Sequence, residues 1–304
     1  MSHERRHEPM TVVLSIKATH HIHVDFVGAY MQEPGDAVVT DRKGHKAMFI
    51  YGRMARDRAT GSTFYFNTEQ LCRPGIGPST RIRFIKTGTA EKPHIYCDYS
   101  RENLKLLRAA AEAEGHGPLP EHQLVWLPIP YNPKEIEPLR LLVSERPTAF
   151  EFDVAVIGGS SHRTNVVERL KECGVRVLRV NGWGMKRDAN VPKAKVLLNV
   201  HLQPESNIYE AARCDRWVFA GMPVLSEACR GQSDLDVADV VTFAERPDKE
   251  CLVDMVKRVV QHWDTWQPAF LERWRKSMPA LQKSRQTTYE IFRDRYDAAV
   301  RGGT

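Results

Sequence analysis

The segment Phe152-Asp-Val-Ala-Val-Ile-Gly-Gly-Ser-Ser-His-Arg163 decides the fold class of this 304-residue chain. Its first residues are mostly apolar and β-branched, as in a buried strand, and two glycines follow directly. Residues 164–173 have apolar side chains at helical spacing, and residues 175–180 form a second predicted strand. This order of strand, turn, helix and strand predicts a parallel βαβ unit.

The same alternation continues downstream of the βαβ unit. We expect further strands at 194–201, 223–226 and 240–243, with helices at 207–220 and 248–262. Together these elements predict a doubly wound, parallel α/β domain over residues 150–262. The remaining residues, 263–304, are expected to form two amphipathic helices that are broken near Pro268 and Pro279.

A second α/β domain is predicted upstream, over residues 11–140, after a polar leader at 1–10. Its expected strands lie at 11–16, 49–51, 63–66 and 124–127. A helix is expected over 100–113, with Ser100 in the N-cap position. Prolines 128, 130, 133 and 138 are too dense for a helix or a central strand, so we expect the interdomain linker between them and about residue 150.

Composition places the chain among globular proteins, with 42% hydrophobic and 27% charged residues. It contains no apolar run near the ~20 residues that span a bilayer. The N-terminus lacks the apolar core of a signal peptide, so a cytoplasmic location is expected. Six scattered cysteines without a CxxC pair predict free thiols and no zinc site. The net charge of +6 suits an anionic ligand, either a nucleotide diphosphate or a nucleic acid, or else a plain basic surface.

The glycine-rich turn Gly158-Gly-Ser160 separates the first strand of the βαβ unit from its helix. Backbone N–H groups and the helix dipole at such a position face an incoming anion, and His162 and Arg163 add further donors. The turn does not match GxGxxG, and no acidic residue follows the second strand to hold a ribose, which disfavours a dehydrogenase. A tight turn that only requires glycine is the alternative interpretation.

A second candidate cluster follows the predicted strand at 194–201. His201 ends that strand on the carboxyl side, where open α/β sheets bind ligands. Glu210 and Arg213 are three residues apart on a predicted helix, near its N-terminus, and Arg216 lies one step further. Arginine binds phosphate with two parallel hydrogen bonds, and a carboxylate accepts hydroxyls of a sugar or ribose. A surface pair of Glu and Arg is the alternative.

These blocks occur in an order that resembles a known family. Residues 153–163 (DVAVIGGSSHR), 197–201 (LLNVH), 210–216 (EAARCDR) and 220–227 (AGMPVLSE) resemble the nucleotide-sugar-binding half of GT-B glycosyltransferases. The most similar branch is the one related to spore-maturation glycosyltransferases. Residues 64–71 (FYFNTEQL), 97–107 (CDYSRENLKLL) and 125–133 (VWLPIPYNP) resemble its N-terminal half. The resemblance covers roughly residues 47 to 230.

The resemblance implies a GT-B fold, in which two Rossmann-like domains face each other across a cleft and the C-terminal helices pack back on the N-terminal domain. It implies transfer of a hexose or pentose from a nucleoside-diphosphate sugar, UDP- or GDP-linked, to a hydroxyl of a glycan or small molecule. No metal and no separate cofactor are expected. The usual Glu-x7-Glu motif is absent, so retention and inversion both stay open. The expected donor-binding residues are Gly158, Ser160, Arg163, His201, Glu210, Arg213 and Arg216, with Glu210 also a catalytic candidate.

Acceptor-side candidates come from the first half of the chain. His21, His23 and Asp25 follow the first predicted strand, where GT-B enzymes often place a base or acceptor contacts. We expect His23, Asp25 and Glu69 to be catalytic, and His21, Gln70, Asp98 and Tyr99 to contact the acceptor. The histidines lack the spacing of helical zinc motifs, and Asp234-Leu-Asp236 falls in a polar loop, so no metal site is predicted.

Two further functions are compatible with the same fold. The acceptor could be nucleic acid, as in enzymes that glycosylate modified DNA bases, and a basic stripe with salt-sensitive DNA binding would favour this. The chain could also bind a nucleotide sugar without catalysis, because a fold does not dictate a function. Donor binding without turnover would indicate that case.

Overall fold

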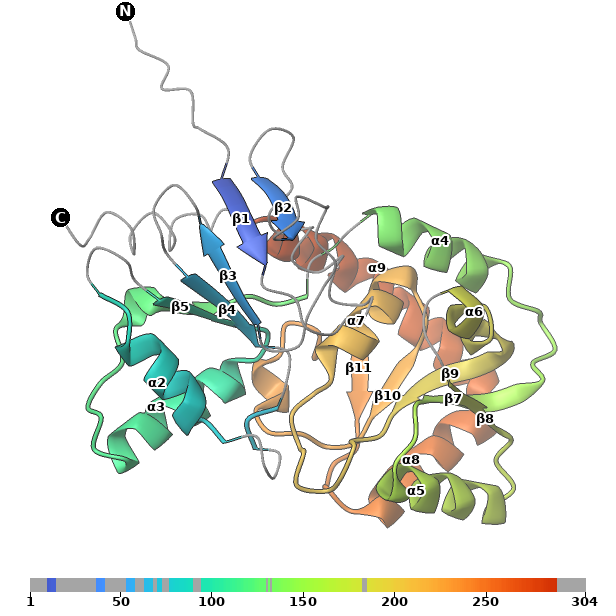
Figure 1. Cartoon of the computed structure of the whole chain (residues 1–304). Coiled ribbons are helices and arrows are strands. Elements are labelled where there is room, and N and C mark those ends of the chain that lie inside the picture. The colour runs from blue at the N-terminus through green and yellow to red at the C-terminus, as the bar shows by residue number, and fades with distance from the viewer. Residues whose placement is uncertain are drawn as a thin grey trace, which may run out of the picture. The chain divides into compact units, whose positions relative to one another are not determined.

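The computed structural model describes residues 10–14, 37–41, 53–57, 63–67, 70–72, 77–89, 94–129, 131, 133–181 and 185–288. The chain divides into two compact units, each with its own β-sheet (Figure 1). Unit 1 comprises Met1–Leu71, Gly75–Pro130 and Thr287–Thr304, and unit 2 comprises Cys72–Pro74 and Tyr131–Gln286. Both units are of the α/β class with largely parallel strands.

The sheet of unit 1 has six described strands in the order β2-β1-β3-β4-β5-β6. The third strand along this sheet, β3, runs antiparallel to both of its neighbours, and the other pairs are parallel. The strands predicted at 11–16, 63–66 and 124–127 are confirmed, whereas 49–51 lies outside the described residues. The strands are β1 Met10–Leu14, β2 Ala37–Asp41, β3 Arg53–Asp57, β4 Thr63–Asn67, β5 His94–Asp98 and β6 Leu124–Trp126.

Two helices of unit 1, α2 (Ser79–Lys86) and α3 (Arg101–Ala113), supply apolar faces to the core beside β5. The predicted helix over 100–113 is confirmed together with its cap, because the Ser100 hydroxyl accepts a hydrogen bond from the Asn103 backbone N–H at 3.4 Å. The buried core residues include Ile82, Ile85, Tyr96, Leu104, Leu107 and Ala111.

The sheet of unit 2 has five parallel strands in the order β11-β10-β9-β7-β8. When the five strands are numbered along the chain and the sheet is read from β8, the order is 2-1-3-4-5. The direction of winding therefore reverses between β7 and β9. Open sheets of this kind bind ligands outside the carboxyl ends of the strands at that reversal. All five strands predicted between 152 and 243 are present: β7 Phe152–Ile157, β8 Val177–Val180, β9 Ala194–Asn199, β10 Val224–Ser226 and β11 Val241–Phe243.

Helices cover both faces of this second sheet (Figure 1). On one face α5 packs against α8, and on the other α4 packs against α7. The valines and leucines of β7 and β9 interdigitate with those of α5 and α8 to form the core of unit 2. The helices are α4 Pro133–Ser144, α5 Ser161–Glu172, α6 Met185–Asp188, α7 Ala211–Ala220, α8 Lys249–Gln261 and α9 Trp263–Gln286.

The proline-rich segment that we predicted to be a linker is instead the helix α4, which includes Pro138. Pro133 opens the helix, at a position where a backbone N–H would have no helical acceptor. Pro138 removes one internal hydrogen bond, which costs about 3 kcal/mol in an isolated helix. Packing of α4 against α7, with Ile136 and Leu139 fully buried, offsets that cost.

The helix α9 is likewise continuous through Pro268 and Pro279, where the sequence predicted two helices. Tertiary contacts within unit 2 hold it in place. The indole N–H of Trp274 donates to the Val218 carbonyl at 2.7 Å, and Arg285 forms an ion pair with the buried Asp215 at 2.9 Å. None of the helices in the described part of the chain, α9 included, is long and apolar enough to cross a membrane.

Candidate anion-binding site

The turn between β7 and α5 brings a helix N-terminus to the carboxyl edge of the second sheet. Gly158 has a φ of +80°, a left-handed conformation that glycine adopts without steric cost. Ser160 then caps α5, since its hydroxyl accepts a hydrogen bond from the Arg163 backbone N–H at 3.1 Å. This cap begins α5 at Ser161, three residues before the predicted start. The positive end of the helix dipole therefore lies at the reversal between β7 and β9.

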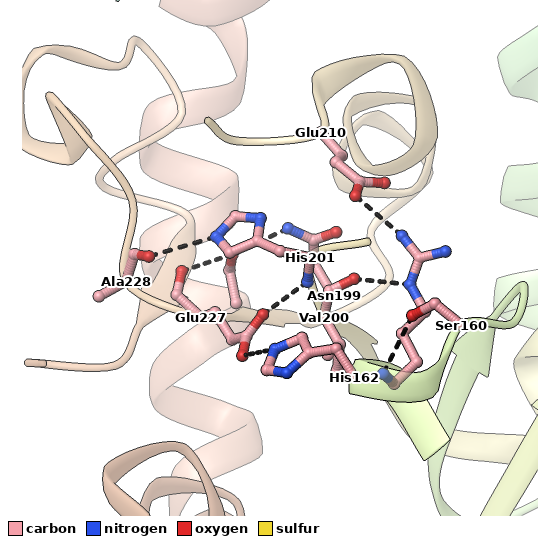
Figure 2. A network of polar contacts seen from close by, with 10 residues as sticks. Ser160, His162, Asn199, Val200, His201, Glu210, Glu227 and Ala228 are labelled. Carbon is pink, nitrogen blue, oxygen red and sulfur yellow. Dashed lines mark hydrogen bonds and ion pairs between the residues drawn. The ribbon is translucent and has the colours of Figure 1, made fainter. Parts of the chain in front are cut away.

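The side chain of Arg163 connects the ends of both strands at this reversal. It is 3% exposed, and its Nε donates to the Val200 carbonyl at 2.8 Å, directly after β9. Its Nη2 donates to the Glu210 carboxylate, also at 2.8 Å (Figure 2). Burial lowers the pKa of Arg163 from its ordinary value, and the Glu210 charge opposes that shift.

Glu210 shares its carboxylate between two arginines. One oxygen binds Arg163, and the other forms an ion pair with the guanidinium of Arg213. The helix α7 begins at Ala211, four residues after the predicted start, so Glu210 occupies the N-cap position and precedes the first helical turn. The side chain of Arg213 is 24% exposed, against 3% for Arg163. Arg213 is therefore the more accessible of the two cations.

A second network lies beside the first and joins the ends of β9 and β10 (Figure 2). Nε2 of His162, in the first turn of α5, lies 2.8 Å from Oε1 of Glu227. The other oxygen of Glu227 accepts the backbone N–H of His201 at 2.5 Å. Glu227 was not among the predicted site residues. It directly follows the predicted strand at 223–226, and His201 ends the predicted strand at 194–201, so the position at a strand end would have identified Glu227 as well.

Several polar atoms near the end of β9 are buried without a hydrogen-bond partner in the described part of the chain. Nε2 of His201 lies 3.2 Å from the Ala228 carbonyl and takes the donor role, which leaves Nδ1 as an unpartnered acceptor. Buried polar atoms in folded proteins are usually paired, so such a group suits a ligand with O–H or N–H donors. The unpartnered atoms here are Asn199 Oδ1, His201 Nδ1, Ser206 Oγ and Asn207 Oδ1.

Arg216 belongs to a different cluster of charges. Its guanidinium pairs with Asp188 at 2.7 Å and with Glu135 at 3.1 Å, and Arg187 pairs with the same Asp188. Arg216 therefore fastens α7 to α4 and α6. The structure brings Ser160, Arg163, Glu210 and Arg213 together and places the Arg216 guanidinium among other carboxylates.

The carboxylate of Asp98, at the end of β5 in unit 1, is 1% exposed and accepts four hydrogen bonds. The donors are Asn67 Nδ2 at 2.8 Å, the Tyr96 hydroxyl at 2.7 Å, the Ser100 N–H at 2.8 Å and Asn103 Nδ2 at 3.0 Å. Burial raises the pKa of Asp98 to about 7, and these donors oppose the rise. Contact with an acceptor would require this side chain to leave its four partners.

The remaining predicted residues divide into buried ones and ones outside the described ranges. Tyr99 and Gln70 are each 7% exposed. Asp236 forms an ion pair with Arg285 at 2.7 Å, and no group of three or more His, Cys, Asp or Glu in the described ranges is placed to hold a metal ion. His21, His23, Asp25 and Glu69 lie outside the described residues, so their roles stay predictions.

Comparison with curated proteins finds three similar proteins from Acanthamoeba polyphaga mimivirus. The chain is 39% identical over 150 residues to uncharacterized protein L138, which covers 48% of this chain and 15% of that protein. Uncharacterized protein L137 is 35% identical over 206 residues, which cover 65% of this chain and 25% of that protein. Uncharacterized protein L140 is 35% identical over 164 residues, which cover 53% of this chain and 47% of that protein. The chain thus spans less than half the length of each relative. No protein-family model matches the chain.

Comparison with solved structures finds chains that are similar to this one at low sequence identity. Sucrose-phosphate synthase from Thermosynechococcus elongatus superposes with a TM-score of 0.41 and 13% identity, covering 67% of this chain and 68% of that one. Spinosyn forosaminyltransferase SpnP gives a TM-score of 0.37 and 12% identity, covering 75% and 82%.

Proposed function

We propose that this chain is a glycosyltransferase that binds the diphosphate of a nucleotide sugar at the carboxyl edge of the β7–β11 sheet. The observation that supports this most directly is the buried Arg163 at the reversal of strand order, linked through Glu210 to the accessible Arg213. The resemblance of residues 153–227 to nucleotide-sugar-binding domains points to the same ligand. We propose UDP- or GDP-linked sugars as donors.

The charges of the site suit a diphosphate leaving group. As the bond between the sugar and the diphosphate breaks, negative charge grows on the diphosphate oxygens, and cations already held in place stabilise that charge. Glu210 holds the guanidiniums of Arg163 and Arg213 in position before a ligand arrives. The N-terminus of α5 adds backbone N–H donors next to them. With two arginines and a helix N-terminus at the diphosphate, the proposed transfer needs no metal ion.

The unpartnered acceptors at the end of β9 suit the hydroxyl-rich part of the same ligand. His201 Nδ1 and Asn199 Oδ1 can each accept a hydrogen bond from a ribose or sugar hydroxyl. Glu227 holds the ring of His162 beside the glycine turn, so this histidine is available as a further contact. The donor would then be held by cations at its diphosphate and by neutral acceptors at its hydroxyls.

Transfer itself forms a bond between the acceptor oxygen and the anomeric carbon while the bond to the diphosphate breaks. The acceptor hydroxyl loses its proton to a base, and the products are a glycoside and a nucleoside diphosphate. We keep His23, Asp25 and Glu69 as the proposed candidates for that base. We propose a hydroxyl of a glycan or a small molecule as the acceptor.

A thermal-shift screen of nucleotide sugars on the full chain tests the proposal. A ligand at 100 times its Kd adds about 2.7 kcal/mol to the free energy of unfolding, which is a readily measured rise in melting temperature. We expect one nucleotide sugar to raise it and to release its nucleoside diphosphate when an acceptor is added. No response to any nucleotide sugar would contradict the proposal. Binding with no release of nucleoside diphosphate under any condition would indicate a binding protein without catalysis.

A further inference from the structure

Arg179, which the sequence argument did not single out, lies next to the glycine turn. It is the penultimate residue of β8 and pairs in register with Val156 of β7. Its Nη1 donates to the Thr164 hydroxyl at 3.2 Å, and that hydroxyl donates in turn to the Ser160 carbonyl at 2.8 Å. The guanidinium of Arg179 is therefore fixed against the first turn of α5.

Each glycine of the turn lies against a guanidinium from a different element. A Cβ atom built on Gly158 would lie 3.2 Å from Nη1 of Arg163, and one built on Gly159 would lie 3.4 Å from Nη2 of Arg179. Arg163 comes from α5 and Arg179 from the neighbouring strand β8. The bare backbone of the two glycines therefore has one planar cation beside each residue.

The charge of Arg179 has no carboxylate partner within 4.0 Å among the described residues. Its Nε is buried and has no hydrogen-bond partner there either. By contrast, Arg163 and Arg213 pair with Glu210, and Arg176, directly before β8, pairs with Asp153. An arginine held without a counter-ion beside the positive end of a helix is electrostatically unfavourable until an anion binds.

We propose that Arg179 binds the diphosphate of the ligand across Gly159, so that the diphosphate lies between the guanidiniums of Arg179 and Arg163. The identity of the ligand as a nucleoside diphosphate rests on the proposed function, whereas its anionic character rests on these contacts. Arginine suits this task because its planar fork donates two parallel hydrogen bonds to phosphate oxygens. The glycines allow the phosphate to approach the backbone closely.

Calorimetric titration of the full-length chain tests this assignment. The probes are UDP, GDP, uridine, guanosine and inorganic pyrophosphate, and the variants are Arg179→Met and Arg179→Lys. Removal of a charge-assisted contact of about 1.5–3 kcal/mol corresponds to roughly 10- to 100-fold weaker binding. We expect Arg179→Met to lose that factor for pyrophosphate and for the diphosphate that binds the wild type, with binding of the nucleosides unchanged. Arg179→Lys should recover part of the loss.

Two further variants make the result unambiguous. Arg169→Met removes the same charge from the outer face of α5, where Arg169 pairs with Glu172 and Glu250, and it should bind every probe within about twofold of wild type. Gly159→Ala places a methyl group at ordinary contact distance from Arg179, so it should fold and yet bind diphosphates less tightly. If Arg179→Met fails to fold by its melting curve, Gly159→Ala provides the test.

The outcomes separate this inference from the proposed function. If the wild type binds UDP or GDP and a folded Arg179→Met binds it equally well, the role of Arg179 is wrong and the proposed function stands. Where Arg179→Met does not fold, equal binding by Gly159→Ala leads to the same conclusion. If the wild type binds pyrophosphate in an Arg179-dependent way but neither UDP nor GDP, the role of Arg179 stands and the proposed function is wrong. A wild type that binds none of the probes overturns both.

Discussion

The guanidinium of Arg163 donates to the carboxylate of Glu210 at 2.8 Å across a separation of 47 residues. The two side chains are 3% and 12% exposed, and loss of Glu210 would leave the Arg163 charge without a carboxylate partner away from water. Removal of one partner of a buried ion pair usually costs far more than the pair contributes, because the remaining charge stays desolvated. This pair therefore fixes both the geometry of the site and part of the stability of unit 2.

Substitution of Glu210 by Gln tests how much the ion pair with Arg163 contributes to stability. Gln keeps an acceptor for Arg163 but removes the negative charge, so we expect the free energy of unfolding to fall by about 1.5–3 kcal/mol. Urea unfolding of the variant measures the loss. Glu168→Gln is the matched control, since Glu168 lies exposed on α5 and, among the described residues, pairs with Lys171 alone across the helix surface. Equal stability of the two variants would contradict the structural role of Glu210.

Arg213→Ala separates ligand binding from folding at the same carboxylate. The side chain of Arg213 is 24% exposed, so its loss should change stability by less than about 1 kcal/mol. Loss of its contact with the donor diphosphate should weaken binding by about 10- to 100-fold. Titration with the donor, alongside a melting curve, measures both quantities. Unchanged donor affinity would refute the assignment of Arg213 to the donor site.

Gly158 and Gly159 should respond differently to alanine. At Gly158 the φ of +80° strains any other residue, and a Cβ would also lie 3.2 Å from the Arg163 guanidinium. We expect Gly158→Ala to destabilise the chain by about 1–2 kcal/mol from backbone strain alone. Gly159 has no positive φ, so Gly159→Ala should leave the urea midpoint nearly unchanged. A neutral Gly158→Ala would mean that the turn relaxes without loss.

The buried carboxyl of Asp215 predicts a pH-dependent stability. Burial raises its pKa to about 7, with Asp236 adding to the rise and Arg285 opposing it. Because the ordinary value is 3.8, the folded chain binds more protons than the unfolded chain between these two pH values. The free energy of unfolding should therefore fall as the pH rises from about 4 to about 7.

Asp215→Asn removes the titrating carboxyl group. The free energy of unfolding of this variant should therefore change less between about pH 4 and about pH 7 than that of the wild type. Asp98 has a raised pKa as well and stays in the variant, so the informative quantity is the difference between variant and wild type. Arg285 keeps Asp236 as a partner at 2.7 Å, which protects the variant from a lone buried cation. Parallel curves from urea unfolding at a series of pH values would show that Asp215 does not titrate in this range.

Binding of the donor should survive a strong chelator. In the proposed site the diphosphate charge is balanced by Arg163, Arg213 and the N-terminus of α5, so EDTA should leave the donor Kd within about twofold, since no metal contact is lost. Titration before and after EDTA treatment measures this. Loss of binding that manganese restores would instead assign a metal role to acidic residues such as Asp234.

Local sequence patterns were sufficient to predict most helices and strands of unit 2. The apolar run at 152–157 and the spacing of Val166, Val167 and Leu170 predicted β7 and the buried face of α5, because period and burial are local properties. The helices α4 and α9 were predicted less well. Their prolines indicate breaks in an isolated chain, and tertiary packing, such as that of α4 against α7, keeps the helices continuous.

At the site, too, local sequence patterns predicted some features, and contacts between residues far apart in the sequence could not be predicted. Strand ends and residue types identified Arg163, His201 and Glu210 as neighbours of one sheet edge, and all three lie there. The sharing of Glu210 between two arginines could not be predicted, since Arg163 and Glu210 are far apart in the sequence. Arg179 was not predicted as a site residue, because a single arginine in a strand has no sequence pattern that distinguishes it from a surface residue.

In the described part of the chain, the side chains of Arg163 and Arg179 form their hydrogen bonds with Thr164, Val200 and Glu210, all inside one compact unit. A mutation within Met1–Leu71 therefore alters none of them directly. In evolutionary terms, the side chains of the proposed anion site are inherited as one continuous segment, and substitutions among the upstream residues replace none of these partners.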